Sequence, residues 1–180
     1  MIDMRKLSME ELHRLSKDEY ESAEKLPAVI VLDNIRSLSN VGAVFRSADA
    51  FRISEVLLCG ITACPPHREI HKTALGADET VKWRYFDTTE AACADLKSRG
   101  FKLFAVEQVE GSVSLQDFQA EPNSAFIMGN EVDGVSEQVL PLCDGAIEIP
   151  QIGTKHSLNV SVCSGIIMWH LFCQLFLPKY

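Results

Sequence analysis

The sequence lacks any apolar run long enough to cross a membrane. Its longest apolar stretch, residues 166–177, is interrupted by His170 and Gln174. It is also shorter than the roughly 20 residues that a transmembrane helix needs. The first residues do not follow the pattern of a secretion signal. We therefore expect a cytoplasmic protein without a membrane partner.

Cysteines with metal-binding spacing are also missing. The six cysteines, at positions 59, 64, 93, 143, 163 and 173, form no CxxC pair. Only His67 and His71 lie near the first two, whereas a structural zinc site usually needs four well-spaced ligands. We expect no metal, and reduced cysteines as in other cytoplasmic proteins.

Two phosphate-binding motifs and an excess of basic residues are absent as well. The sequence contains neither G-x-G-x-x-G nor G-x-x-x-x-G-K-[ST], which disfavours the NAD and ATP sites built on those loops. Lys and Arg number 17 against 25 Asp and Glu, and the formal net charge is −8. A protein that binds the phosphate backbone of a nucleic acid generally carries a basic surface. The balance therefore argues against strong, non-specific nucleic-acid binding, and we expect no DNA partner.

What is present indicates an α/β fold. The 180 residues suffice for a domain with a substantial core. Short apolar runs alternate with helical patterns, which is typical of a mostly parallel sheet flanked by helices. Strands are predicted at residues 28–33, 55–60, 79–86, 101–107, 124–129 and 145–150. Helices or helical turns are predicted at residues 40–51, 67–77, 88–99, 136–143 and 157–177.

A charged segment precedes the first predicted strand. Residues 4–24 are helix-prone, and Ser8 and Glu11 are placed as a capping box. We therefore divide the chain into an N-terminal helical extension, residues 1–25, and a main domain, residues 26–180.

The helix predicted at residues 40–51 carries one arginine in a stretch of mostly small and apolar residues, NVGAVFRSADAF. The apolar residues fall on one face at spacings of three and four. Arg46 points to the opposite side, where its neighbours one turn away are glycine and alanine. Arg46 either pairs with Asp49, three positions further on, or presents its guanidinium to a ligand or another backbone. The helical pattern alone leaves both possibilities open.

Polar loops containing glycine or capping residues follow three of the predicted strands. In parallel α/β sheets, ligands bind beyond the carboxyl ends of the strands. One loop contains Gly129 and Gly134, which allow close approach of the backbone or a positive φ. Another contains Ser157, a natural N-cap for the closing helix. The three loops, residues 32–40, 127–136 and 149–159, together indicate a binding site.

Three motifs in these loops occur in a characteristic order. They are NIRSLSNVGAVFRSADAF, FIMGNEVDGVS and IEIPQIGTKHSLNVSVCSGI, with KTALGADETVKW between the first two. In these motifs the sequence resembles the SpoU/TrmH family of S-adenosylmethionine-dependent RNA ribose 2′-O-methyltransferases, within the SPOUT superfamily. The resemblance covers about residues 28–175.

The resemblance implies a SPOUT methyltransferase fold with a C-terminal deep trefoil knot. It also implies a homodimer in which two subunits complete each active site, S-adenosylmethionine as cofactor, and tRNA or rRNA as the RNA partner. By matched position, the cofactor would be bound by Met128, Gly129, Ile149, Gln151, Ile152, Leu158 and Val160.

The same resemblance implies roles for five catalytic-site residues. Arg46 would act on the ribose 2′-hydroxyl, either as a base perturbed by its site or as a fixed cation that steadies the developing alkoxide. Four further residues would organise that arginine and the substrate: Asn40, Glu131, Ser157 and Asn159.

Two other functions stay open at the level of the sequence. One is a non-catalytic RNA-binding or assembly factor on the same fold, although such a factor needs none of the five catalytic-site residues. The other is a small-molecule-binding α/β domain without an RNA partner, which the acidic net charge keeps in consideration.

Overall fold

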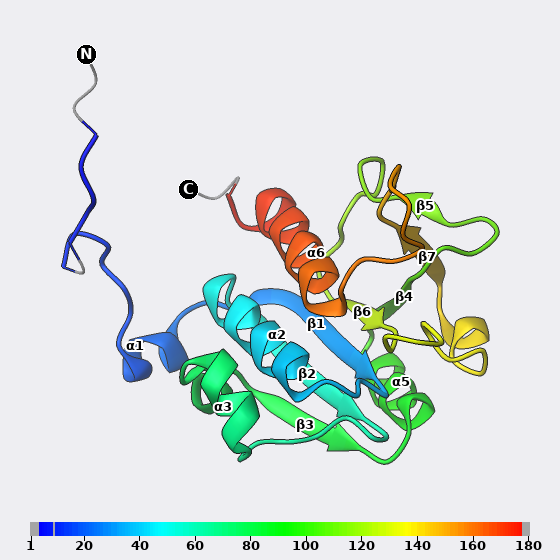
Figure 1. Cartoon of the computed structure of the whole chain (residues 1–180), viewed down its shortest axis with the longest axis horizontal. Helices are drawn as coiled ribbons and strands as arrows, with labels where there is room; N and C mark the ends of the chain where they lie inside the picture. Colours follow the sequence, from blue (N-terminus) through cyan, green and yellow to red (C-terminus); the bar gives the residue numbers. More distant parts are fainter. Residues whose placement is uncertain (1–3, 9, 178–180) are drawn as a thin grey trace.

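A seven-stranded, wholly parallel sheet forms the centre of the protein (Figure 1). The computed structural model describes residues 4–8 and 10–177. The strands lie in the order β3-β2-β1-β6-β4-β7-β5. Their bounds are β1 Leu26–Asp33, β2 Ile53–Cys59, β3 Trp83–Phe86, β4 Lys102–Val106, β5 Val113–Ser114, β6 Ser124–Met128 and β7 Gly145–Glu148. The predicted α/β fold with a parallel sheet is confirmed.

Helices cover both faces of the sheet. Their bounds are α1 Lys17–Ser22, α2 Leu38–Ala50, α3 Arg68–Ala74, α4 Ala77–Thr80, α5 Thr89–Ser98 and α6 Val160–Leu175, with a 3₁₀ turn at Leu140–Leu142. Apolar residues of α2, α3 and α6 share one buried cluster, and those of α5 belong to the other. None of the described helices is long and apolar enough to cross a membrane.

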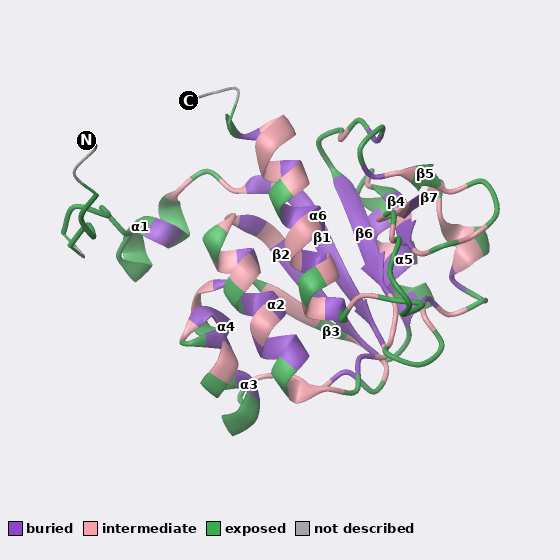
Figure 2. Ribbon diagram, turned by 45° about the horizontal axis from the view of Figure 1, so that its top comes forward, coloured by how far each residue is buried: buried purple, intermediate pink, exposed green. Residues whose placement is uncertain are grey.

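The central strands have apolar side chains on both faces, which explains their unbroken apolar runs. Along β1, Ile30 and Leu32 point into the cluster with α2 and α6, whereas Val29 and Val31 point into the cluster with α5. Successive side chains of a strand alternate between faces, so a strand covered on both sides must be apolar throughout. Figure 2 shows β6 buried along its whole length.

The predicted N-terminal helix is much shorter than expected. Ser8 and Glu11 do make the reciprocal bonds of a capping box, at 2.8 and 3.3 Å, but only a turn follows them. Helix α1 begins after a second capping box, Ser16 with Glu19. In α1, Tyr20 is buried against the main domain, whereas residues 4–8 and 10–15 extend away from the sheet (Figure 1). A short helix is marginal where it buries no apolar face.

Three further elements differ from the prediction. The helix predicted at residues 136–143 is only a 3₁₀ turn at Leu140–Leu142. The strand predicted at residues 79–86 begins only at Trp83, because helix α4 occupies Ala77–Thr80. Thr80 donates its hydroxyl to Asp49 at 2.8 Å, a tertiary contact that ties α4 to α2. Strand β5, Val113–Ser114, was not predicted, since two residues carry no periodic pattern. The C-terminal knot stays a prediction.

Candidate active site

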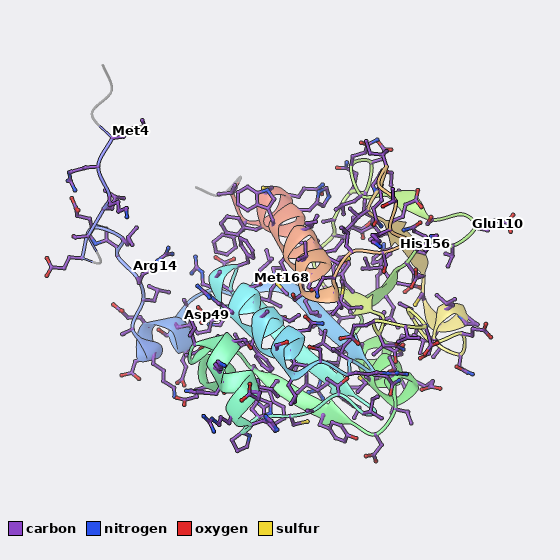
Figure 3. All side chains as sticks on the ribbon, viewed as in Figure 1. Met4, Arg14, Asp49, Glu110, His156 and Met168 are labelled. Atoms are coloured by element: carbon purple, nitrogen blue, oxygen red, sulfur yellow. The ribbon has the colours of Figure 1, made fainter. Side chains whose placement is uncertain are left out.

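A cavity of about 490 Å³ opens at the carboxyl ends of β4, β6 and β7 and reaches the start of α6. It lies at the sheet edge where ligands of parallel α/β proteins bind. Figure 3 labels one lining residue, His156, on the segment that leads from β7 to α6. The lining comprises residues 106–108, 128–134, 147–149, 151, 156–160 and 163.

Six of the seven predicted cofactor residues line this cavity: Met128, Gly129, Ile149, Gln151, Leu158 and Val160. The seventh, Ile152, does not, and its side chain is fully exposed at 105%. Segments that are distant in the sequence meet here because β6 and β7 both border β4 in the sheet.

Asn40, Glu131 and Asn159 form a hydrogen-bonded chain beside the cavity. Asn40 Nδ2 donates to Glu131 Oε1 at 2.9 Å, and Asn159 Nδ2 donates to Asn40 Oδ1 at 3.1 Å. Glu131 also accepts the backbone N–H groups of Arg36 and Ser37, at 3.2 and 3.3 Å. The chain thus joins all three predicted loops.

Hydrogen bonding holds Glu131 in its charged form. Burial by itself would raise the pKa of this carboxyl group, but the bonds from Asn40 and from the backbone outweigh burial, and the pKa is lowered. Hydrogen bonds that an ionised carboxylate accepts favour the ionised form. Glu131 is therefore an anion that fixes the loop after β1 and the start of α2.

Asn159, and not Ser157, caps the closing helix. Asn159 Oδ1 accepts from the N–H groups of Ser161 and Val162, at 2.9 and 3.4 Å, and helix α6 starts at Val160. The predicted start at Ser157 is wrong, because the asparagine oxygen satisfies the free amides two positions later. Ser157 is an exposed residue of the cavity lining.

Arg46 lies outside the cavity of its own chain. It is exposed, on the same helix as Asn40 and about 9 Å further along its axis. Within the described part of the chain it makes no hydrogen bond or ion pair. The ion pair with Asp49 that the helical spacing allowed is not formed, and Asp49 Oδ1 accepts the hydroxyl of Thr80. One chain therefore brings together four of the five predicted catalytic-site residues and leaves Arg46 apart.

A fourth segment of the site, residues 106–108, lies outside the three predicted loops. Glu107 Oε2 accepts the N–H of Val135 at 3.1 Å, and Gln108 Nε2 donates to the carbonyl of His156 at 3.3 Å. The sequence does contain a sign of this segment. The strand predicted at residues 101–107 is followed by polar residues, as are the three strands whose loops were assigned to the site.

The cavity lining is strongly acidic. It contains no Lys or Arg, and its carboxylates are Glu107, Glu131, Asp133 and Glu148. Asp133 is partly neutralised by Arg36, whose Nη2 lies 3.6 Å from its Oδ2. Such a lining favours a ligand that carries positive charge.

Comparisons with known proteins agree with this arrangement. A 23S rRNA (guanosine-2′-O-)-methyltransferase RlmB from Neisseria meningitidis is 30% identical over 152 residues, which cover 84% of this chain and 60% of the relative. A tRNA (guanosine(18)-2′-O)-methyltransferase from Thermus thermophilus is 32% identical over 140 residues, covering 78% of this chain and 71% of the relative. The chain thus spans less than two thirds of the length of the first relative.

A solved structure is similar over nearly the whole chain. The AdoMet-bound rRNA methyltransferase from Sinorhizobium meliloti superposes with a TM-score of 0.77 at 25% identity, covering 91% of this chain and 62% of that chain. Residues 27–169 match the SpoU rRNA Methylase family, and this span includes the cavity and all three motifs. The chain therefore belongs to the SpoU rRNA methylase family.

Proposed function

We propose that this protein transfers a methyl group from S-adenosylmethionine to a ribose 2′-hydroxyl of tRNA or rRNA. The observation that carries the proposal is the cavity at the carboxyl ends of the strands, where the Asn40–Glu131–Asn159 chain adjoins the lining. The relatives named for 2′-O-methylation of rRNA and tRNA support the same reaction.

The cavity suits S-adenosylmethionine in both volume and charge. When bound, this cofactor supplies an activated methyl group on a positively charged sulfonium, which the carboxylates of the lining favour. Gly129 lines the cavity, and its missing side chain lets the backbone of Gly134 and Val135 pack directly against it. The residues that would hold the cofactor are the six predicted residues that line the cavity: Met128, Gly129, Ile149, Gln151, Leu158 and Val160.

We assign to Arg46 the role of acting on the ribose 2′-hydroxyl. Its planar guanidinium can both orient a phosphate or hydroxyl oxygen and stabilise negative charge that develops on it. Glu131 holds the start of α2 through Asn40 and so sets the position of this helix. Ser157 and Asn159 lie at the cavity, where they can order the sugar.

The position of Arg46 supports a homodimer with shared active sites. The side chain is exposed and unpaired on α2, which packs beside α6 (Figure 1). On α6, Val162 and Trp169 lie two turns apart on one face, and each is 52% exposed. A second copy would cover this face and bring Arg46 to the cavity of its partner.

A subunit-mixing experiment tests this arrangement. Arg46→Ala removes the guanidinium, and Gly129→Ala disables the cofactor cavity, so each homodimer is inactive. In co-expressed mixtures, half of the dimers carry both variants, and one intact site in each should restore about a quarter of wild-type activity. No restoration would mean that Arg46 acts within its own chain.

The domain division is also a proposal. We assign residues 1–25 to an extension and residues 26–180 to the methyltransferase domain, because β1 starts at Leu26 and the family match starts at residue 27. Deleting the first 15 residues should leave the binding of S-adenosylmethionine unchanged.

Methylation mapping tests the function as a whole. RNA from cells without the protein should accept a methyl group from S-adenosylmethionine in the presence of the purified protein, and sequencing should locate one unmethylated ribose in the untreated RNA. RNA binding without methyl transfer would indicate the assembly-factor alternative. Binding of S-adenosylmethionine without any RNA binding would indicate a small-molecule-binding domain.

A further inference from the structure

Strand β6 lies between β1 and β4, and each of these neighbours ends in a carboxylate. Asp33 closes β1, and Glu107 follows directly after β4. Both reach over to the loop that follows β6. Glu107 Oε2 accepts the N–H of Val135 at 3.1 Å, and Asp33 Oδ2 accepts the N–H of Ser136 at 2.7 Å. Two consecutive amides of the loop are therefore held from opposite sides.

Asp33 is fully buried, and its two side-chain oxygens accept three hydrogen bonds. Its Oδ1 accepts hydrogen bonds from the hydroxyl of Thr89 at 2.5 Å and from the side-chain amide of Asn34 at 2.9 Å. A buried carboxylate is tolerated only when its oxygens are satisfied in this way. Thr89 is the first residue of α5, so Asp33 ties the loop to a helix as well as to the sheet.

Glu107 also packs directly against the loop that follows β6. Gly134 has φ +70°, and a Cβ there would lie 2.1 Å from Glu107 Oε2. A Cβ on Gly129 would in turn lie 2.1 Å from the carbonyl carbon of Gly134. Gly134 is thus in direct contact with Gly129 on one side and with the Glu107 carboxylate on the other. A shift of the Glu107 carboxylate would be transmitted to Gly129, which lines the cavity.

We infer that Asp33 and Glu107 are positioning residues that clamp the cavity wall formed by residues 129–136 in the geometry that binds the cofactor. The inference rests on the proposed function, since it assigns the cavity to S-adenosylmethionine. The clamp requires carboxylates. Glu107 accepts one backbone N–H on each oxygen, from Gln108 at 2.9 Å and from Val135. A glutamine offers a single acceptor oxygen, so one of these N–H groups would face another donor.

Glu107→Gln tests the clamp with little change in volume. Glu137→Gln is the matched control, because Glu137 is an exposed residue of the same loop that lies outside the cavity lining. Calorimetry should give a Kd for S-adenosylmethionine at least tenfold higher for Glu107→Gln than for the wild type or the control. With RNA substrate, KM for S-adenosylmethionine should rise similarly while kcat at saturation changes little.

Amide hydrogen exchange, followed without any ligand, gives an independent result. The N–H of Val135 should exchange at least tenfold faster in Glu107→Gln, whereas the N–H of Ser136, held by Asp33, should stay protected. Unchanged exchange at Val135 or an unchanged Kd would overturn the inference. If the wild type fails to bind S-adenosylmethionine, the proposed function is wrong, and the exchange data still decide whether the clamp exists.

Discussion

Asn40 Nδ2 and Glu131 Oε1 are joined by a hydrogen bond of 2.9 Å, although 91 positions separate the two residues. The bond fixes the first turn of α2 against the loop after β6. Arg46 belongs to the same helix, so this contact also sets where the guanidinium lies relative to the cavity. A local interaction at the cavity rim therefore positions a side chain two turns away.

Arg46→Ala should abolish most of the turnover without changing the fold or the cofactor affinity. The side chain is exposed, unpaired and outside the cavity lining of its own chain, so its loss removes no structural contact within it. Loss of a group that stabilises developing charge lowers kcat by about 10²–10³-fold. Steady-state kinetics and calorimetry measure the two quantities.

Two variants sharpen the test of Arg46. Arg46→Lys should also fall well below wild-type turnover, because an ammonium cannot reproduce the planar guanidinium. Near-normal turnover in Arg46→Lys would rule out the proposed geometry. Arg68→Ala is the control for losing an exposed helical arginine, and it should keep the wild-type turnover.

Glu131→Gln should destabilise the fold in a pH-dependent way. The pKa of Glu131 is lowered in the folded protein, so its contribution to stability is complete above its ordinary value of 4.5 and is lost as pH falls through the folded pKa. We expect the variant to be about 1 kcal/mol less stable at neutral pH, a value kept small because the residue is exposed. Urea unfolding should show the difference between wild type and variant shrinking below pH 4.5. A constant difference would contradict the assigned role.

Gly129→Ala should impair cofactor binding far more than Gly153→Ala. A Cβ at Gly129 would lie 2.1 Å from Gly134 C and 2.2 Å from the Val135 nitrogen, so the backbone of the cavity wall must move. Gly153 has no atom within 4 Å of the same position. Calorimetry with S-adenosylmethionine should show at least a tenfold loss of affinity for the first variant only. Equal effects would mean that the close backbone contact is unimportant.

Glu55→Gln should cost about 3 kcal/mol of unfolding free energy. Glu55 is 1% exposed and binds Arg84 Nε at 2.7 Å and Arg99 Nη1 at 3.0 Å. Burial would raise its pKa, but the bonds from the two arginines lower it, so the group is charged. We expect the lower end of the range for broken buried pairs, since both arginines still bond Asp95.

A surface pair provides the control for Glu55. Glu121 bonds Lys102 at 2.6 Å, and both side chains are more than half exposed. Glu121→Gln should therefore change the unfolding free energy by less than about 1 kcal/mol. Urea unfolding at neutral pH, with unchanged m-values, measures both variants. Similar losses in the two would show that burial does not govern the network.

The sequence predicted the elements that carry a strong pattern of their own. The run at residues 28–33 lies within β1, because a strand covered on both faces must be apolar throughout. Strand β5 exists only because it pairs with β7, and two residues have no pattern to detect. The cap of α6 was misplaced for a similar reason. Ser157 and Asn159 can both cap a helix, and the bond from Asn159 to Asn40 belongs to the tertiary structure.

The sequence by itself determined the fold class and the family, and it named six residues that line the cavity, because these depend on local runs and on motifs in a given order. Only the tertiary structure decided that Glu107 belongs to the site, that Asn159 caps α6 and that Arg46 stays outside the cavity of its own chain. Sheet order is the physical reason. It places the ends of β1 and β4 on either side of β6, and no spacing along the chain contains that adjacency.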